Sequence, residues 1–332
     1  MSDVRVSMDA PRLSIVVPVY NEEDGLAALF ARLYPALDAL RESYEIIFIN
    51  DGSRDRSAAL LKDQFLARPD VTRVILFNAN YGQHLAIMAG FERARGERVV
   101  TLDADLQNPP EEIGKLLAAM DAGADYVGGV RRQREDAWWR RIASRLMNRL
   151  RERITRIRMT DQGCMLRAYS RDIVDAVAAS REVSTFIPAL AYTFAHKPTE
   201  IEVAHEERAA GDSKYSLYKL IRLNFDLVTG FSLVPLQMFS MFGILVSIAA
   251  VITYVIVMAN RLVLAGWRDG IGTLWDRDIL AFFLIGVMLF GLGLVGEYVG
   301  RIYQQVRERP RYMIRAVLER DQRGDAPGGR LG

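Results

Sequence analysis

The sequence has a single cysteine, Cys164, and only three histidines among its 332 residues. One cysteine excludes an internal disulfide and a zinc site built on cysteines. This usage fits a reducing compartment, and the histidines show no metal-ligand spacing. Residues 1–11 are polar and lack the apolar core of a signal peptide, so none is expected.

Two nucleotide-binding fingerprints are also missing. No Gly-x-Gly-x-x-Gly follows the first expected strand, which removes the usual evidence for a dinucleotide site, and no Gly-x-x-x-x-Gly-Lys-Ser/Thr motif of a P-loop occurs. We find no internal repeat. A nucleotide bound by this chain must therefore be held by carboxylates, a metal ion and arginines.

Residues 13–102 show a regular alternation of apolar strands and helices. Strands are expected at 13–20, 45–50, 72–77 and 98–102, with helices ending near Leu40, Leu66 and Arg93. This alternation predicts an α/β fold with a mostly parallel, doubly wound sheet. Polar clusters end each of these strands, and we expect them to converge on one crevice: Tyr20-Asn21-Glu22, Asp51-Gly52-Ser53, Gln83 and Asp103-Ala104-Asp105.

Asp103 and Asp105 follow an apolar run that predicts a buried strand, and Asn108-Pro109-Pro110 ends the extended segment. Glu111-Glu112 then begins a helix, whose first turn favours acidic residues. Two carboxylates one residue apart suit Mg²⁺ or Mn²⁺, which usually shares its coordination shell with substrate phosphates. A bare Asp-x-Asp on its own more often marks a solvated turn after a strand. The other strand-end clusters favour the metal site.

Residues 131–158 hold eleven arginines, with Trp138, Trp139 and aliphatic residues recurring at three- and four-residue steps. This pattern predicts a basic amphipathic helix at a membrane surface. Nucleic-acid binding and a solvated helix face are the alternatives, and the apolar runs downstream favour the membrane. Arg131, Arg132 and Lys214 are our candidates for binding an anionic phosphate.

Beyond this helix, 161–169 has sheet-like character, 184–194 predicts an apolar helix and 201–206 an edge strand. Residues 213–230 predict a juxtamembrane helix. The runs 231–260 and 279–296 carry no charged residue, which predicts a transmembrane hairpin rather than two core helices.

The Lys/Arg bias of the flanks places both termini in the cytoplasm. The expected order in this part of the chain is a first span at 231–260, a periplasmic loop at 261–278, a second span at 279–297, a cytoplasmic segment at 298–318 and a disordered tail at 319–332.

Three stretches, Pro18–Glu22, Asp51–Ser53 and Asp103–Gln107, resemble the motifs of GT-A glycosyltransferases of family 2. The full set resembles the polyprenyl-phosphate glycosyltransferase branch, over about residues 12–318. Within that branch, four stretches are most similar to members that transfer 4-deoxy-4-formamido-L-arabinose: 80–84, 102–113, 163–169 and 184–188.

The resemblance implies a GT-A catalytic domain over 12–212 and a divalent cation, Mg²⁺ or Mn²⁺. By resemblance, the uracil and ribose pocket is lined by Pro18, Tyr20, Glu22 and Asp51. Asp103 contacts the nucleotide sugar, Asp105 ligates the metal, and Gln107 supports the metal or the phosphates. Asp161 matches the catalytic base or acceptor-orienting position, although a loop carboxylate without a role is the alternative.

The implied partners are a UDP-sugar, undecaprenyl phosphate and the bilayer, with no nucleic acid. A homo-oligomer, a tetramer by resemblance, in the bacterial inner membrane is expected. The alternatives are transfer of glucose to the same lipid and a non-catalytic nucleotide-sugar scaffold, against which the intact Asp103 and Asp105 argue. His84 is expected to be a polar or capping residue, and Cys164 a packed core residue.

Overall fold

The structure is a computed structural model. It describes residues 10–131, 159–161, 163–180, 186–206, 274–306, 310–320 and 330–331, with short helical pieces between 236 and 252. The chain forms two compact units. One comprises Met1–Glu152, Arg156–Tyr215 and Arg309–Gly332, and the other comprises Arg153–Thr155 and Ser216–Glu308. The chain therefore leaves the first unit and returns to it near its C-terminal end.

A nine-stranded sheet forms the centre of the first unit, in the order β7-β5-β6-β4-β1-β2-β3-β8-β9. Its strands are β1 (Leu13–Val19), β2 (Tyr44–Asn50), β3 (Thr72–Phe77), β4 (Arg98–Thr101), β5 (Tyr126–Arg131), β6 (Arg167–Ser170), β7 (Pro198–Val203), β8 (Ile314–Leu318) and β9 (Arg330–Leu331).

Most strands run in one direction. β1 pairs in parallel with β2 and β4, and β2 with β3. β6 is antiparallel to both β4 and β5, so β5 and its parallel partner β7 share the direction of β4. The predicted mostly parallel α/β sheet is confirmed, and β7 is an edge strand as expected.

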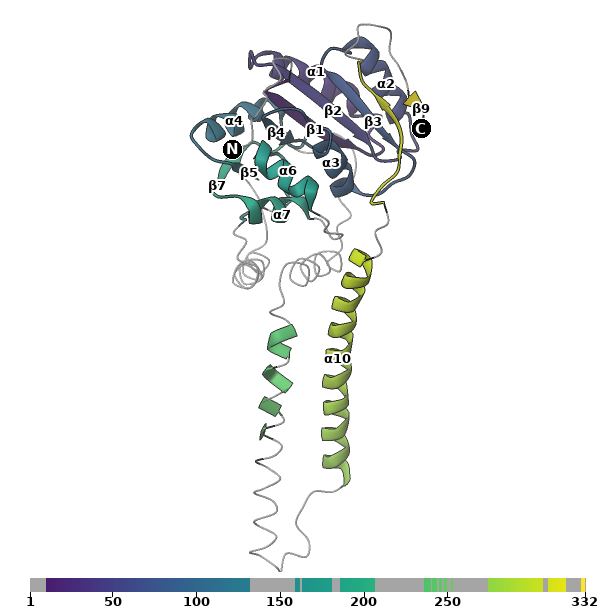
Figure 1. The fold of residues 1–332 in the computed structure, drawn as a ribbon, viewed down its shortest axis with the longest axis vertical. Coiled ribbons are helices and arrows are strands. Elements are labelled where there is room, and N and C mark those ends of the chain that lie inside the picture. Colours follow the sequence, from purple (N-terminus) through teal and green to yellow (C-terminus); the bar gives the residue numbers. More distant parts are fainter. Residues whose placement is uncertain are drawn as a thin grey trace, which may run out of the picture. The chain divides into compact units, whose positions relative to one another are not determined.

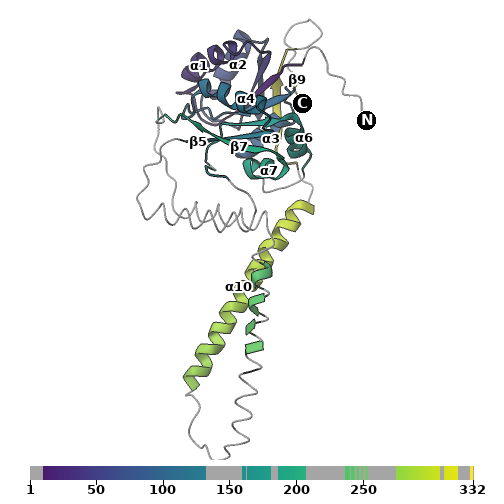
Figure 2. The same ribbon diagram turned by 90° about the vertical axis from the view of Figure 1, so that its left-hand side faces the viewer.

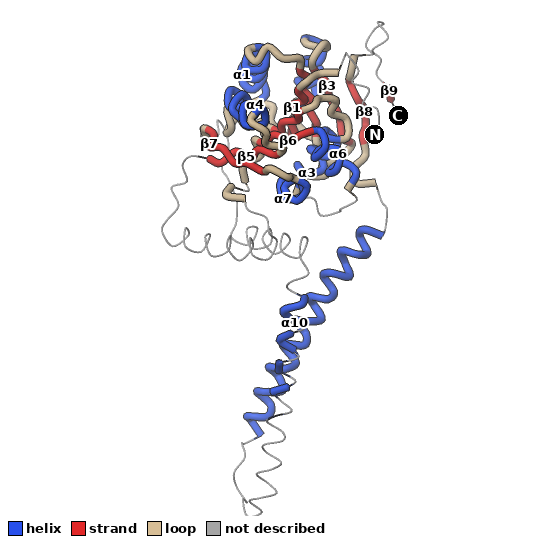
Figure 3. The backbone as a smooth tube through the Cα atoms, turned by 60° about the vertical axis from the view of Figure 1, so that its left-hand side comes forward, coloured by secondary structure: helices blue, strands red, loops and turns tan. Residues whose placement is uncertain are grey.

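Two helical layers cover the sheet, as Figures 1 and 2 show. One face carries α1 (Leu26–Asp38), α2 (Ser57–Ala67) and, after the short 3-10 helix η1 (Pro110–Glu112), α4 (Ile113–Asp121). The other carries α3 (Gln83–Phe91), α6 (Arg171–Ala179) and α7 (Ile187–Phe194) (Figure 3).

The central strands are apolar on both faces because both are covered. Leu13, Ile15 and Val17 pack into the core under α1. Val16 points to the other face, where a Cβ added to Gly90 of α3 would lie 2.4 Å from its Cγ1. Glycine at position 90 thus lets α3 approach the sheet.

β4 ends before its neighbour β1 does. β4 ends at Thr101, opposite Val16, and the last bond between the two strands joins the Leu102 amide to the Val16 carbonyl (3.1 Å). Pro18, two residues further along β1, faces the same side. Because β4 has already ended at this point, the missing backbone N–H of Pro18 costs the sheet no hydrogen bond between strands.

The C-terminal part of the sheet differs from the sequence prediction. Residues 298–318 were expected outside the catalytic domain, whereas β8 pairs antiparallel with β3. Arg330–Leu331, in the expected disordered tail, form β9 beside β8. A five-residue run such as Ile314–Leu318 carries no local signal for the distant strand that it pairs with.

The second unit contains α10 (Leu274–Val306), which spans the second predicted membrane segment. Phe239 packs on α10, with its ring centroid 5.9 Å from that of Phe290 and its edge over Gly291. In the described part of the chain, no helix is both long and apolar enough to cross a membrane. Most of three predicted segments lies outside the described residues: the basic helix at 131–158, the juxtamembrane helix at 213–230 and the first span at 231–260.

Candidate active site

The loops after β1, β2, β3 and β4 meet at one edge of the sheet, as predicted for parallel strands. Two of them are linked directly: the Asn21 amide donates to Ser53 Oγ (3.0 Å) and the Glu22 amide to Ser57 Oγ (2.9 Å). Asn21 has a φ of +53°, a conformation that asparagine tolerates better than most residues. Tyr20, beside it, keeps 43% of its surface exposed.

Asp51, at the end of β2, organises the next loop. Its Oδ1 accepts from the Tyr81 amide (2.7 Å), and its Oδ2 accepts from Asn80 Nδ2 and the Gly82 amide (both 2.9 Å). Desolvation raises the pKa of this buried carboxyl above its usual value, and the two backbone amides partly offset the shift. Asp51 therefore holds the loop 80–82, and it is also a residue that we expect to contact uridine.

Close approach of the two loops requires glycine after Asp51. Gly52 has a φ of +66°, and a Cβ at this position would lie 2.3 Å from the Ala79 carbonyl carbon. Any side chain here would push the loops apart. The Asp51-Gly52 pair is thus explained by packing of the loop after β3.

Asp103, at the end of β4, receives a hydrogen bond from Gln83 Nε2 at 2.5 Å. The pKa of Asp103 is raised to about 7, first by desolvation and then by the Asp105 carboxylate, while the Gln83 bond opposes the shift. Gln83 was noted in the sequence as one of the strand-end polar residues but not selected as a site residue. It is the first residue of α3 and connects the Asp51 loop to Asp103.

Asp105 lies in a tight turn. Its Oδ1 accepts from the Gln107 amide (3.2 Å), and Leu106 between them has a φ of +60° with its side chain buried. Strained backbone of this kind concentrates at functional sites. The turn presents two carboxylates one residue apart at this edge of the sheet.

The donor set fits a hard divalent cation. Two carboxylates whose mutual repulsion raises the pKa of one of them are stabilised by a shared positive charge. Across the described residues, no group of three or more His, Cys, Asp or Glu side chains forms a metal cluster. Mg²⁺ commonly takes one or two carboxylates and completes its shell with substrate phosphates and water.

The turn of residues 103–107, which we call the metal turn because we expect Asp105 to bind the cation, is tied to the segment that follows β7. The Gln107 carbonyl accepts from the Glu206 amide (2.9 Å). Arg32 of α1 forms two hydrogen bonds to Glu111 (2.9 and 3.0 Å) and two to Glu206 (2.8 and 3.0 Å). These ion pairs are partly exposed and individually weak, but together they hold 107–111 and 206 against α1.

Arg131 and Asp161 form a bidentate ion pair. Nε of Arg131 donates to Oδ2 (2.6 Å) and Nη2 to Oδ1 (2.8 Å), while the Gly163 amide also donates to Oδ1 (3.0 Å). Burial acts to raise the pKa of Asp161, but Arg131 outweighs it and holds the pKa below its usual value. A carboxylate held in this way is a poor proton acceptor.

Arg167, which is completely buried, supports the same loop and was missed in the sequence analysis. Its guanidinium donates to the carbonyls of Asp161 (2.6 Å) and Cys164 (2.8 Å) and to the Tyr126 hydroxyl. A buried charge is tolerated only when it is well hydrogen-bonded. Arg167 therefore fixes the backbone that carries Asp161.

The remaining candidates divide into two groups. Cys164 is buried, with its pKa raised to about 11, first by burial, and the pKa of His84 is lowered to about 4 by burial and then by Arg167. At neutral pH the Cys164 thiol therefore stays protonated, which does not suit a nucleophile, and the His84 ring stays uncharged. Arg132 and Lys214 lie outside the described residues, so their proximity to Arg131 stays a prediction.

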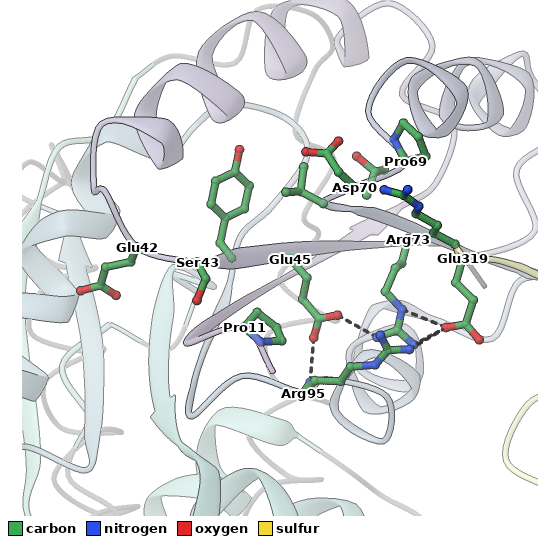
Figure 4. A pocket seen from close by; sticks show the side chains of 13 residues that line it. Pro11, Glu42, Ser43, Glu45, Pro69, Asp70, Arg73, Arg95 and Glu319 are labelled. Carbon is green, nitrogen blue, oxygen red and sulfur yellow. Dashed lines mark hydrogen bonds and ion pairs between the residues drawn. The ribbon is translucent and has the colours of Figure 1, made fainter. Parts of the chain in front are cut away.

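A pocket of about 550 Å³ lies at the opposite edge of the sheet, where β2 and β3 begin. Figure 4 shows its centre, where Glu45 and Glu319 face Arg73 and Arg95. Arg73 bonds Glu45 (2.9 Å) and Glu319 (2.8 Å), and Arg95 bonds Glu319 (3.1 Å). These charges are mutually paired, so the network anchors the end of β8.

Comparison with known proteins places residues 14–178 in "Glycosyl transferase family 2". The undecaprenyl-phosphate 4-deoxy-4-formamido-L-arabinose transferase of Aeromonas hydrophila is 48% identical, over 93% of this chain and 95% of that protein. The Proteus mirabilis protein of the same name is 47% identical, over 92% and 94%. Mannosyl-3-phosphoglycerate synthase from Rubrobacter xylanophilus matches with a TM-score of 0.48 and 13% identity, over 67% of this chain and 73% of that one.

Proposed function

The chain belongs to glycosyl transferase family 2 and, within it, to the undecaprenyl-phosphate 4-deoxy-4-formamido-L-arabinose transferases, and from this premise we propose how its residues divide the reaction. It is a glycosyltransferase that moves 4-deoxy-4-formamido-L-arabinose to undecaprenyl phosphate. We propose that UDP carries the sugar and that transfer is a single inverting displacement. The observation that supports this proposal most is that Asp51 follows β2, and Asp103 and Asp105 follow β4, at one edge of the sheet. β2 and β4 are the two parallel neighbours of β1.

We assign the donor to this edge. Pro18, Tyr20, Glu22 and Asp51 would line the uridine, with Tyr20 exposed at the rim. Asp103 would contact the sugar nucleotide, and Gln107 would support the diphosphate. Asp105 would hold Mg²⁺ or Mn²⁺, which, when bound, neutralises charge on the UDP leaving group.

We assign the acceptor phosphate to the Arg131 side. A phosphate monoester is already anionic near neutral pH, so its oxygen attacks the anomeric carbon as the bond to UDP breaks, without a strong general base. Asp161, held ionised by Arg131, then acts as a positioning residue: it fixes the guanidinium that faces the lipid phosphate. Arg132 and Lys214 would add positive charge there.

We further propose that the enzyme is a multi-pass protein of the bacterial inner membrane with a cytoplasmic catalytic unit. The support is the sequence of the uncharged runs 231–260 and 279–296, with Lys/Arg-rich outer flanks. A homo-oligomer, with a tetramer as the first expectation, completes the proposal and is tested by native mass spectrometry in detergent.

The decisive experiment measures UDP release by the purified full chain. Release is expected only when the UDP-sugar, undecaprenyl phosphate and a divalent metal are all present. A panel of UDP-sugars then tests specificity. A rate with UDP-glucose above that with the 4-deoxy-4-formamido-L-arabinose donor would reject the assigned sugar. Donor binding without any lipid-dependent release would reject catalysis altogether.

A further inference from the structure

A short segment after the helical unit contacts the nucleotide edge of the catalytic sheet. β8 lies beside β3 (Figure 3). The two strands are antiparallel, with Ile314 opposite Phe77 and Leu318 opposite Val74. The residues just before β8 therefore lie at the carboxyl end of β3, where the loop 78–82 begins. Glu319, just after β8, lies at the opposite edge.

Tyr312 and Met313 contact the loop 78–82 and the residues that flank the segment of this loop and α3. The Tyr312 ring stacks on Phe77, with centroids 4.8 Å apart and planes 19° apart, and its hydroxyl donates to Glu92. Phe77 precedes the loop and Glu92 follows α3. Tyr312 thus joins the two ends of the segment that contains the loop and α3.

The contacts continue into the loop itself. The Asn78 amide donates to the Met313 carbonyl (3.2 Å), and the Tyr81 hydroxyl donates to Asn78 Oδ1 (2.8 Å). Tyr81 also packs edge-on against Phe77, with centroids 5.7 Å apart. The Tyr81 amide bonds Asp51, and Gln83 two residues later bonds Asp103.

We propose that Tyr312 is a positioning residue for the nucleotide site. The rings of Tyr312 and Tyr81 both pack on Phe77. Through this contact Tyr312 sets the loop whose amides bind Asp51 and whose end places Gln83 on Asp103. This inference rests on the proposed donor site. It implies that residues 310–314, far along the chain from the glycosyltransferase motifs, determine donor affinity, while the acceptor side at Arg131 and Asp161 is unaffected.

The test compares three full-length variants in steady-state kinetics and in calorimetric titration with UDP and Mn²⁺. Tyr312→Ala is expected to raise the KM for the UDP-sugar and the Kd for UDP about tenfold, with the KM for undecaprenyl phosphate unchanged. Tyr312→Phe keeps the stacked ring and is expected to restore both constants to within about twofold.

Glu319→Gln is the matched control. It weakens the anchoring of β8 by removing the carboxylate that Arg73 and Arg95 share, but it acts at the opposite sheet edge. It should lower Tm without changing either KM. If Glu319→Gln and Tyr312→Ala lose donor affinity equally, Tyr312 only stabilises the fold and the inference is wrong. Unchanged donor KM and UDP Kd values in Tyr312→Ala would also overturn it. Failure of the wild-type chain to bind UDP would instead reject the donor site.

Discussion

Arg131 and Asp161 are joined by two hydrogen bonds, of 2.6 and 2.8 Å, in which the guanidinium matches the carboxylate edge to edge. Bidentate geometry is more specific than a single ion pair. The carboxylate receives a third hydrogen bond, from the Gly163 amide. A side chain at position 163 would crowd the pair, since its Cβ would lie 2.8 Å from Arg131 Nη2. The local backbone is arranged around this pair.

The first prediction is that the two residues act as a unit. Asp161→Asn and Arg131→Gln should each lower kcat at least about tenfold, because either change releases the other side chain. The double variant should then be no more than about threefold slower than the slower single variant. Multiplicative losses in this cycle would instead indicate separate roles, with Asp161 acting directly on the substrate.

The second prediction concerns stability against acid. Arg131 holds the pKa of Asp161 below its ordinary value of 3.8. The stabilisation that comes from this low pKa is therefore complete above about pH 5 and is lost as the pH falls through the folded-state value. At pH 7, Asp161→Asn should cost about 2–3 kcal/mol.

The measurement is the difference in Tm between the wild type and Asp161→Asn, taken at intervals from pH 7 to pH 3. It should shrink only below about pH 4. Asp175→Asn is the control, since Asp175 also pairs with an arginine, Arg171, but is 64% exposed. A difference that stays constant down to pH 3 would show that the pair does not control the pKa of Asp161.

The third prediction tests the metal turn. Asp105→Asn should abolish turnover and leave the fold intact, because it removes a carboxylate expected to ligate the ion. Residual activity above about a tenth in saturating Mn²⁺, a barrier change below roughly 1.4 kcal/mol, would contradict a metal role. Asp121→Asn, which changes an exposed partner of Arg98, should retain full activity.

The sequence predicted well what depends on local periodicity. The strands at 13–20, 45–50, 72–77 and 98–102 agree with β1 to β4 to within a few residues. Their polar ends also lie together, because parallel strands must end at one edge. The pattern alone therefore predicted that Asp103 and Asp105 lie at this edge.

Long-range side-chain choices were not predictable in this way. Arg73 and Glu319 pair across 246 residues, and no local pattern links β8 to β3. Arg167 stands in an apolar run, but only the structure shows that its charge is satisfied by carbonyl oxygens. Gln83 was placed at the right edge, yet its bond to Asp103 depends on how α3 begins.

The fourth prediction concerns topology. Both termini should be cytoplasmic, with 261–278 on the other side, because the outer flanks carry the Lys/Arg excess. A cysteine introduced by Gly270→Cys should react with an impermeant maleimide in cells whose outer membrane alone is permeable. The wild-type chain is the control, since Cys164 is buried. Labelling that requires opening of the inner membrane would reject this topology.

The last prediction concerns the basic segment that begins at Arg131. Trp138 and Trp139 lie outside the described residues, and their sequence setting among eleven arginines is that of an interfacial helix. Anionic lipid contributes about 1 kcal/mol for each nearby arginine, and salt screens this attraction. The tryptophans would add apolar insertion beside the site of the lipid phosphate.

We therefore expect the double change Trp138→Ala and Trp139→Ala to raise the KM for undecaprenyl phosphate in nanodiscs. The KM for the UDP-sugar should barely change, because the donor residues end other strands. Arg131→Gln should also lower kcat, since Arg131 is assigned to the phosphate during attack. Steady-state kinetics with each substrate varied in turn separates these effects. Equal rises in both KM values for the tryptophan pair would indicate general misfolding, and the docking role would then have to be abandoned.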